Sequence, residues 1–197
     1  MSESLPLPPR DEQTDAKAWF YLQHRSDIET WAALRRDGAQ LLERYLLALL
    51  PPLEDLATEL DAEMYARDLE SGAWPRLGLR RPTWQHQGTH DVAVVAEWDR
   101  GRLLGATRPW PYVGVRISPS QSDQGRKRAV ADAVRNTRAV FAEPRLPSWP
   151  AWRYVSPPGT VRQVDPEALA TGAWKALREL WALVAHDLDV LHESRTL

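Results

Sequence analysis

The strongest constraint on the fold is a block of strand-like sequence between residues 74 and 117, in which only short turns interrupt the strands. Parallel strands need crossover connections of a dozen or more residues, and this block has no room for them. It therefore predicts an antiparallel meander. Asp99-Arg100-Gly101 supplies turn chemistry for a returning strand at 102–106. The three main strand patterns, rich in β-branched and aromatic residues, are residues 74–82, 90–98 and 110–117.

Helical patterns flank this block on both sides. Residues 28–49 repeat apolar side chains at steps of three and four, after the capping-box sequence Ser26-Asp27-Ile28-Glu29. Pro51-Pro52 ends or bends this helix, and the next helix is predicted to continue through Met64 and to stop near Gly72. The later predicted elements are a helix at 122–142, a short strand at 152–156 and a helix that Asp165 caps.

Together these patterns predict an α+β fold with a three- to four-stranded, mainly antiparallel sheet. An N-terminal helical hairpin, a middle helix and a long C-terminal helix accompany the sheet. Residues 1–14 are polar and proline-rich, which is typical of a flexible tail. The rest is predicted to be one domain at 15–197, made of a hairpin at 15–72, a sheet and helix at 73–164, and the C-terminal helix at 165–197.

Composition excludes some kinds of site chemistry and indicates the cellular compartment. The chain has no cysteine, which excludes disulfides, thiolate zinc sites and cysteine nucleophiles. The sequence starts without a secretory pattern, and its longest apolar cluster, Tyr45–Pro52, is too short for a bilayer. We therefore expect a cytoplasmic protein with no membrane contact. Arginine is abundant while lysine, asparagine and isoleucine are scarce, as in a GC-rich bacterial genome, so the arginine count carries no functional signal by itself.

The order α-β-β-β-α-β resembles the core of PD-(D/E)xK nucleases, which implies carboxylates and a lysine around a divalent metal. Asp91 and Glu97 share strand parity, but a separation of about 20 Å prevents them from sharing one ion. No lysine occurs between Lys17 and Lys127. A divergent phosphodiesterase that uses these acids or His90 is therefore the runner-up hypothesis.

Other motif searches return little. Phosphate-loop, dinucleotide-loop, zincin and serine-hydrolase motifs are absent from the sequence. His86, His90 and Asp91 are a weak alternative metal site, because loop spacing does not fix ligand geometry as a helix would. Ordinary loop hydrogen bonding is the favoured role for them. No cofactor is predicted, and catalysis is less expected than binding.

Charge is distributed unevenly along the chain. Residues 51–70 hold seven acids and one base, a net charge of −6, whereas residues 100–138 hold nine bases and two acids, a net charge of +7. Either these stretches are complementary, within the fold or across a dimer interface, or the basic stretch binds phosphate backbone. The candidate binding residues are Arg100, Arg102, Trp110, Arg116, Arg126, Lys127, Arg128, Arg135 and Arg138.

Ten tryptophans are a further unusual feature. A small-ligand sensor with an aromatic groove is a third hypothesis, although such residues more often fill the ends of a sheet core. The leading prediction is a small bacterial accessory or regulatory protein that binds a macromolecular partner without catalysis. That partner is a protein, a second copy of the chain, or nucleic acid. The residues of the hypothetical groove are Trp84, Trp98, Trp110 and Trp152.

Overall fold

A computed structural model describes residues 12–86, 89–104, 111–119, 121–143, 146–156 and 164–193. The chain divides into two compact units, Met1–Gly38 and Ala39–Leu197. Within the described ranges, no helix has both the length and the apolar character that crossing a bilayer requires.

The first unit consists of α1 (Glu12–Gln23) and the beginning of α2 (Arg25–Leu47). The Tyr21 hydroxyl donates a 2.5 Å hydrogen bond to Glu29. The predicted helix at 28–49 is confirmed by α2, which starts one residue before the expected cap, Ser26. None of the described side chains from residue 15 to residue 38 is buried.

The second unit is built on a five-stranded sheet in which every neighbouring pair is antiparallel. This confirms the predicted α+β class and the antiparallel sheet, but the expected strand number was too low. A separate two-stranded hairpin joins β3 (Gln85–His86) to β4 (Thr89–His90). In spatial order the sheet contains β1 (Glu63–Arg67), β2 (Arg76–Arg80), β5 (Val92–Glu97), β6 (Tyr112–Ile117) and β7 (Ala151–Tyr154).

Strand β1 replaces the end of a predicted helix. α3 (Leu50–Glu59) stops because Asp61 adopts φ 52, a left-handed conformation that ends a right-handed helix. The chain then pairs with β2, so the prediction of a helix through Met64 is wrong. The returning strand expected at 102–106 is also missing from residues 102–104, which form turns, and its last two positions lie outside the described residues.

Two further helices complete the unit. α4 (Gln124–Ala133) is capped by Asp123, whose side chain accepts hydrogen bonds from the N–H groups of Gly125 and Arg126. A 3-10 helix, η1 (Arg135–Ala139), follows, so the helix predicted at 122–142 is regular only in its first half. α5 (Pro166–Glu193) starts as predicted, because Asp165 accepts hydrogen bonds from Glu167 and Ala168.

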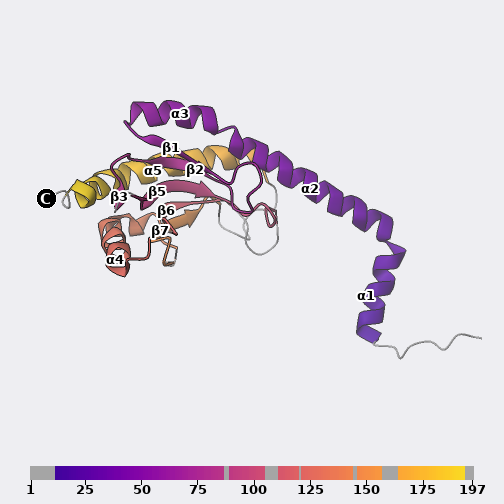
Figure 1. Ribbon diagram of the computed structural model, residues 1–197. Coiled ribbons are helices and arrows are strands. Elements are labelled where there is room, and N and C mark those ends of the chain that lie inside the picture. Colours follow the sequence, from indigo (N-terminus) through magenta and orange to yellow (C-terminus); the bar gives the residue numbers. More distant parts are fainter. Residues whose placement is uncertain are drawn as a thin grey trace, which may run out of the picture. The chain divides into compact units, whose positions relative to one another are not determined.

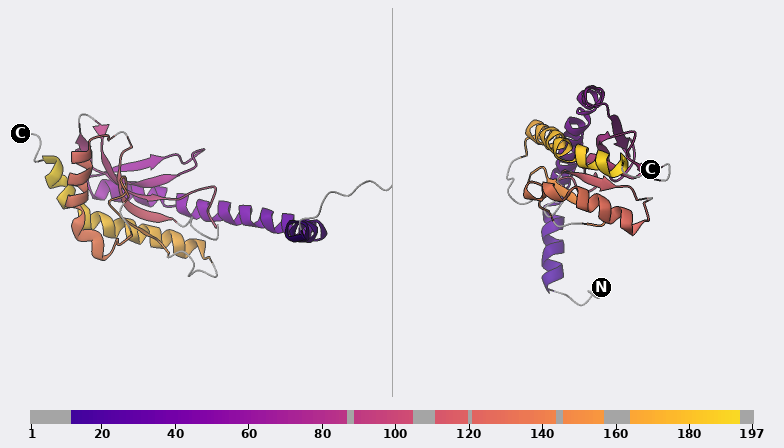
Figure 2. Two further views of the ribbon diagram at one scale, coloured as in Figure 1. Left: turned by 90° about the horizontal axis from the view of Figure 1, so that it is seen from below. Right: turned by 90° about the vertical axis from the view of Figure 1, so that its left-hand side faces the viewer.

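The main core lies between α5 and one face of the sheet. Val94 and Val115 pair in register on β5 and β6, and they join Leu180 of α5 in one buried cluster. α3 lies beside β1 and β2, and α4 lies towards β6 and β7 (Figure 1). Both α4 and α5 lie on the same side of the strands (Figure 2). The predicted apolar stripe of the C-terminal helix is therefore the principal cover of the sheet.

The opposite face, here called the open face, carries a second and smaller cluster made entirely of strand and loop residues in the described part of the chain. Tyr112 packs edge-on against Trp149 and Trp152, at centroid distances of 5.0 and 5.5 Å. Gly114 lies beneath these rings, because a Cβ there would be 2.5 Å from the Cβ of Trp152. Large aromatic side chains thus shield the middle of this face.

Candidate functional site

Asp91 belongs to a buried ion cluster that ties the sheet to two helices. The Nε of Arg126 on α4 donates to Oδ2 of Asp91 at 2.5 Å, and Nε2 of His192 on α5 lies 2.8 Å from Oδ1. All three side chains are at most 2% exposed. Strand β5 begins one residue later, so the strand alternation does not extend to Asp91. The prediction that Asp91 and Glu97 share a side of the sheet is therefore wrong.

His192 is held at both ring nitrogens. Its Nδ1 lies 2.6 Å from the carbonyl oxygen of Leu188, and its Nε2 faces the Asp91 carboxylate. Both neighbours are acceptors, and both nitrogens can donate only in the imidazolium form. The carboxylate of Asp91 lies between the guanidinium of Arg126 and the imidazole of His192. The cluster therefore has a structural role: its polar groups contact one another in the protein interior.

The pKa of Asp91 is expected to lie below its ordinary value of 3.8. Burial alone raises it, but hydrogen bonds from His192 and Arg126, together with their charges, outweigh burial. Because the folded-state pKa is the lower one, this stabilisation is complete above 3.8 and is lost as pH falls through the folded value. A carbon-13 NMR titration of the Asp91 carboxyl in the folded chain measures this directly, and a midpoint at or above 3.8 contradicts it.

The carboxylate of Glu97 is held by neighbouring side chains on the open face. Its carboxylate accepts hydrogen bonds from Nε of Arg76 and from the hydroxyl of Tyr112. Nε of Arg116 lies 3.5 Å from the same group. Burial and the charge of Glu97 raise the pKa of Tyr112, which keeps its hydroxyl a donor. Both candidate catalytic acids therefore have internal partners for both carboxylate oxygens.

The suggested metal ligands do not converge. His86 Nε2 is 3.9 Å from Asp123, and His90 Nε2 is 3.8 Å from Glu63, whereas Asp91 faces the helices. Among the residues described, no three histidine or acidic side chains form a group that could hold a metal ion.

The basic residues of the 100–138 stretch are dispersed rather than gathered in one patch. Arg100 pairs with Glu43 at 2.6 Å and donates to the carbonyls of Leu69 and Gly72. Arg126 is buried in the ion cluster. Both side chains therefore hold the fold together.

The remaining candidates lie at separate places. Arg102 and Arg135 are exposed beside Asp99 and Asp132, their own near neighbours in sequence. Lys127 and Arg128 line a pocket of about 280 Å³ next to α4, and Arg116 lies on the open face. Trp110 and the side chain of Arg138 lie outside the described residues.

The acidic stretch makes its ion pairs elsewhere than with the basic stretch among the described residues. Across the described ranges, no ion pair joins residues 51–70 to residues 100–138. Glu63 of the acidic stretch instead pairs with Arg80 at 2.9 Å. No direct ion pair among the described residues therefore supports the intramolecular form of the complementarity hypothesis, which stays a prediction.

The tryptophans do not form the suggested groove. Trp84 and Trp98 are fully buried in the main core, where the Trp84 indole donates to Asp189 at 2.7 Å. Trp152 belongs to the cluster on the open face, and Trp110 lies outside the described residues. The three described rings thus fill two different clusters.

Sequence reasoning missed three arginines on β1 and β2. Arg67, Arg76 and Arg80 line a pocket on the open face together with Arg116. They lie outside the basic stretch, in sequence whose average charge is unremarkable. The available signal was the strand alternation Arg76-x-Gly78-x-Arg80, which places both arginines of β2 on one face.

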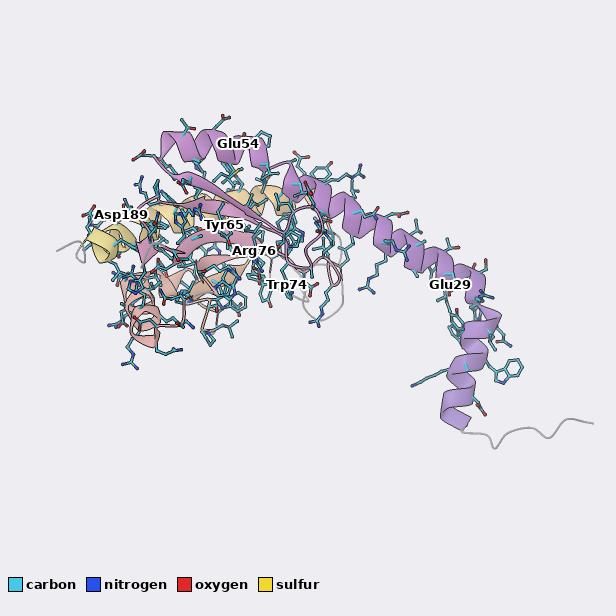
Figure 3. All side chains as sticks on the ribbon, in the orientation of Figure 1. Glu29, Glu54, Tyr65, Trp74, Arg76 and Asp189 are labelled. Carbon is cyan, nitrogen blue, oxygen red and sulfur yellow. The ribbon has the colours of Figure 1, made fainter. Side chains whose placement is uncertain are left out.

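The N-terminal helices, defined here as residues 15–38, carry large apolar side chains in contact with solvent. The exposed fraction is 68% for Trp31 and about 60% for four others. The side chain of Glu29 marks this segment in Figure 3. The four others are Trp19, Phe20, Leu22 and Leu34.

No protein-family model, curated protein or solved structure matches this chain. Its function is therefore inferred from its residues and their contacts.

Proposed function

We propose that this chain is a non-catalytic accessory protein that binds another protein through its N-terminal helices. The observation that carries this proposal is the exposure of Trp31, at 68%, in a segment without a buried side chain. Large apolar side chains that are exposed together in one segment mark interaction sites. Tryptophan is also the residue type most enriched among the few that dominate binding energy.

The energetics favour a partner for these helices. α1 has 12 residues, and an isolated helix of that length is marginal in water. Removing one large apolar side chain from water contributes about 1.5–3 kcal/mol. Burial of Trp19, Phe20 and Trp31 against a partner thus supplies the stabilisation that the segment lacks on its own.

The charge of the segment favours a protein over nucleic acid. Residues 15–38 contain four acids and four bases, which gives a net charge of zero. Such a surface gains little from phosphate backbone, whose binding depends on an excess of lysine and arginine. The partner that matches this surface is a folded protein with an apolar groove. The groove binds the helices through their aromatic side chains.

Hydrogen exchange and affinity measurements test this proposal. In the full chain alone, amides 15–38 are expected to exchange nearly as fast as in an unfolded peptide. A protein co-purified from the source cells, then purified separately, is expected to protect them. Trp31→Ser should weaken its affinity by about thirtyfold, which corresponds to a hot-spot loss of about 2 kcal/mol.

Arg36→Ser is the matched control, because this charged residue is also exposed on the same helix. It should retain the affinity within about twofold. Protected amides in a monomeric chain, or equal affinities for both variants, contradict the proposal. If sedimentation shows a dimer that Trp31→Ser dissociates, the occupant is a second copy, and the proposal of a different protein is wrong.

A further inference from the structure

A pocket of about 380 Å³ opens on the sheet face that carries no helix among the described residues. This volume is within the range of small-molecule sites. Its walls come from β1, β2 and β6, and the β4 hairpin lies at one end. Tyr65 and Arg76 lie close together on the adjacent strands β1 and β2 (Figure 3). The polar residues that line it include Arg67, Arg76, Arg80, Arg116, Thr89 and His90.

Positive charge is in excess around this pocket. Four arginines line it, and the acids in or beside it are Asp68, Glu63 and Glu97, which leaves a net charge of +1. Arg80 also acts on His90: burial first, and then the charge of Arg80, lower the pKa of this histidine despite Glu63 and Asp91 nearby. The four guanidinium groups, rather than the histidine, supply the positive charge that attracts an anion.

The sheet register shapes the floor. Ala93 pairs with Arg116 across β5 and β6, while Leu79 pairs with Val94, so Arg80 comes next to Ala93 on the other side. Two strand spacings separate the arginine backbones by about 10 Å. On the strand between them, the register places the methyl group of Ala93. Because the alanine side chain is short, space is left between the long side chains of Arg80 and Arg116. This space, here called the slot, has room for a compact anion.

Two lining residues have a buried nitrogen outside hydrogen-bonding geometry, and that of Arg116 faces the Glu97 carboxylate at 3.5 Å. Nε of Arg116 and Nδ1 of His90 make no hydrogen bond with any residue that the structure describes. An unsatisfied buried polar group costs about 1–3 kcal/mol. Arg80 makes its ion pair with Glu63 through Nε, and a guanidinium has four more N–H donors on its terminal nitrogens. The side chains that line the slot thus have hydrogen-bonding capacity for a bound anion.

We propose that this pocket binds the phosphate group of a small molecule, with Arg80 and Arg116 gripping it from opposite sides. A phosphate monoester presents three terminal oxygens in a tetrahedral array, which two guanidinium groups can approach from different strands. A planar carboxylate has only two oxygens to share. The space beyond the slot, against the ring of Tyr65, accommodates the organic part of the ligand. This site is independent of the N-terminal helices.

Calorimetric titration of the full chain tests the site, with phenyl phosphate as the probe, inorganic phosphate as competitor and benzoate as the carboxylate comparison. Phenyl phosphate is expected to bind at least about tenfold more tightly than benzoate, and inorganic phosphate should displace it. Arg116→Met should weaken binding by about tenfold or more. Its fold should survive, because Glu97 keeps its contacts with Arg76 and Tyr112.

Thr89→Glu places a negative charge at the exposed rim of the pocket and should abolish binding even if Arg116→Met does not fold. Arg102→Met removes an arginine that is 74% exposed elsewhere, and it should bind like the unmodified chain. Unchanged affinity in Thr89→Glu, or an equal loss in Arg102→Met, overturns the proposal. It is also overturned if benzoate matches phenyl phosphate, or if only a polynucleotide binds and phosphate does not compete.

Discussion

Replacing Asp91 with asparagine is expected to lower the free energy of unfolding by about 3–5 kcal/mol. The substitution removes the negative charge that faces Arg126 and His192 while leaving the guanidinium of Arg126 in the interior. Arg126 has no route to water, since its side chain is only 1% exposed. The cost is that of an uncompensated buried charge, and it exceeds the modest net value of the intact pair. Urea unfolding of the variant and the unmodified chain measures the difference.

Asp55→Asn is the matched control, because it makes the same chemical change at an exposed position on α3. It should alter the unfolding free energy by no more than about 0.5 kcal/mol. Adding Arg126→Met to Asp91→Asn should restore part of the lost stability, since no unpaired guanidinium then remains. A loss below about 1 kcal/mol in Asp91→Asn would show that the cluster does not stabilise the fold as described.

The second large effect is expected at the centre of the sheet. Gly78 of β2 lies so close to β5 that an added Cβ would be 2.0 Å from the carbonyl oxygen of Val94 and 2.7 Å from Cα of Val95. Both are backbone atoms, so the clash cannot be relieved by rotating a side chain. Gly78→Ala must push two paired strands apart, and we expect it to lower the unfolding free energy by about 3 kcal/mol.

Gly101→Ala provides the comparison, because the nearest atom to its Cβ would be Oδ1 of Asp99 at 3.5 Å, an ordinary contact. The same substitution there should leave stability unchanged or raise it by about 0.4–1 kcal/mol, by restricting the unfolded chain. Thermal unfolding followed by circular dichroism ranks the two variants. Equal melting temperatures would mean that β2 and β5 do not approach as closely as the structure shows.

The spacing of apolar residues was enough to predict a helix or strand where one face of that element is strongly buried. β5 is buried along its whole length, and α5 has a continuous buried stripe from Leu169 to Leu188, so both stood out in the sequence. β1 did not, because all but one of its residues are half-buried and neither face is distinctly apolar. Beyond the end of α3, Arg81 donates to the carbonyls of Leu60 and Asp61, a contact across about 20 positions that local sequence does not reveal.

The candidate sites were harder to predict because their residues are far apart in sequence. Arg126 lies 35 positions from Asp91, and His192 lies 101 positions from it, so no local spacing relates them. Arginine is normally at the surface, and a sequence argument therefore assigned Arg126 to a binding patch. The pocket arginines come from strands whose adjacency is known only once β1 pairs with β2 and β6 with β5.

The position of α5 has a consequence for how the protein is made. Synthesis proceeds from the N-terminus, so all five strands leave the ribosome before Pro166, the first residue of the helix that covers their apolar face. The nascent chain therefore presents a sheet that α3 and α4 cover only in part until α5 emerges, and its ion cluster is completed only when His192 reaches Asp91. An exposed apolar sheet is prone to aggregate and is what chaperones recognise. Biosynthesis of this chain should depend on protection during that interval.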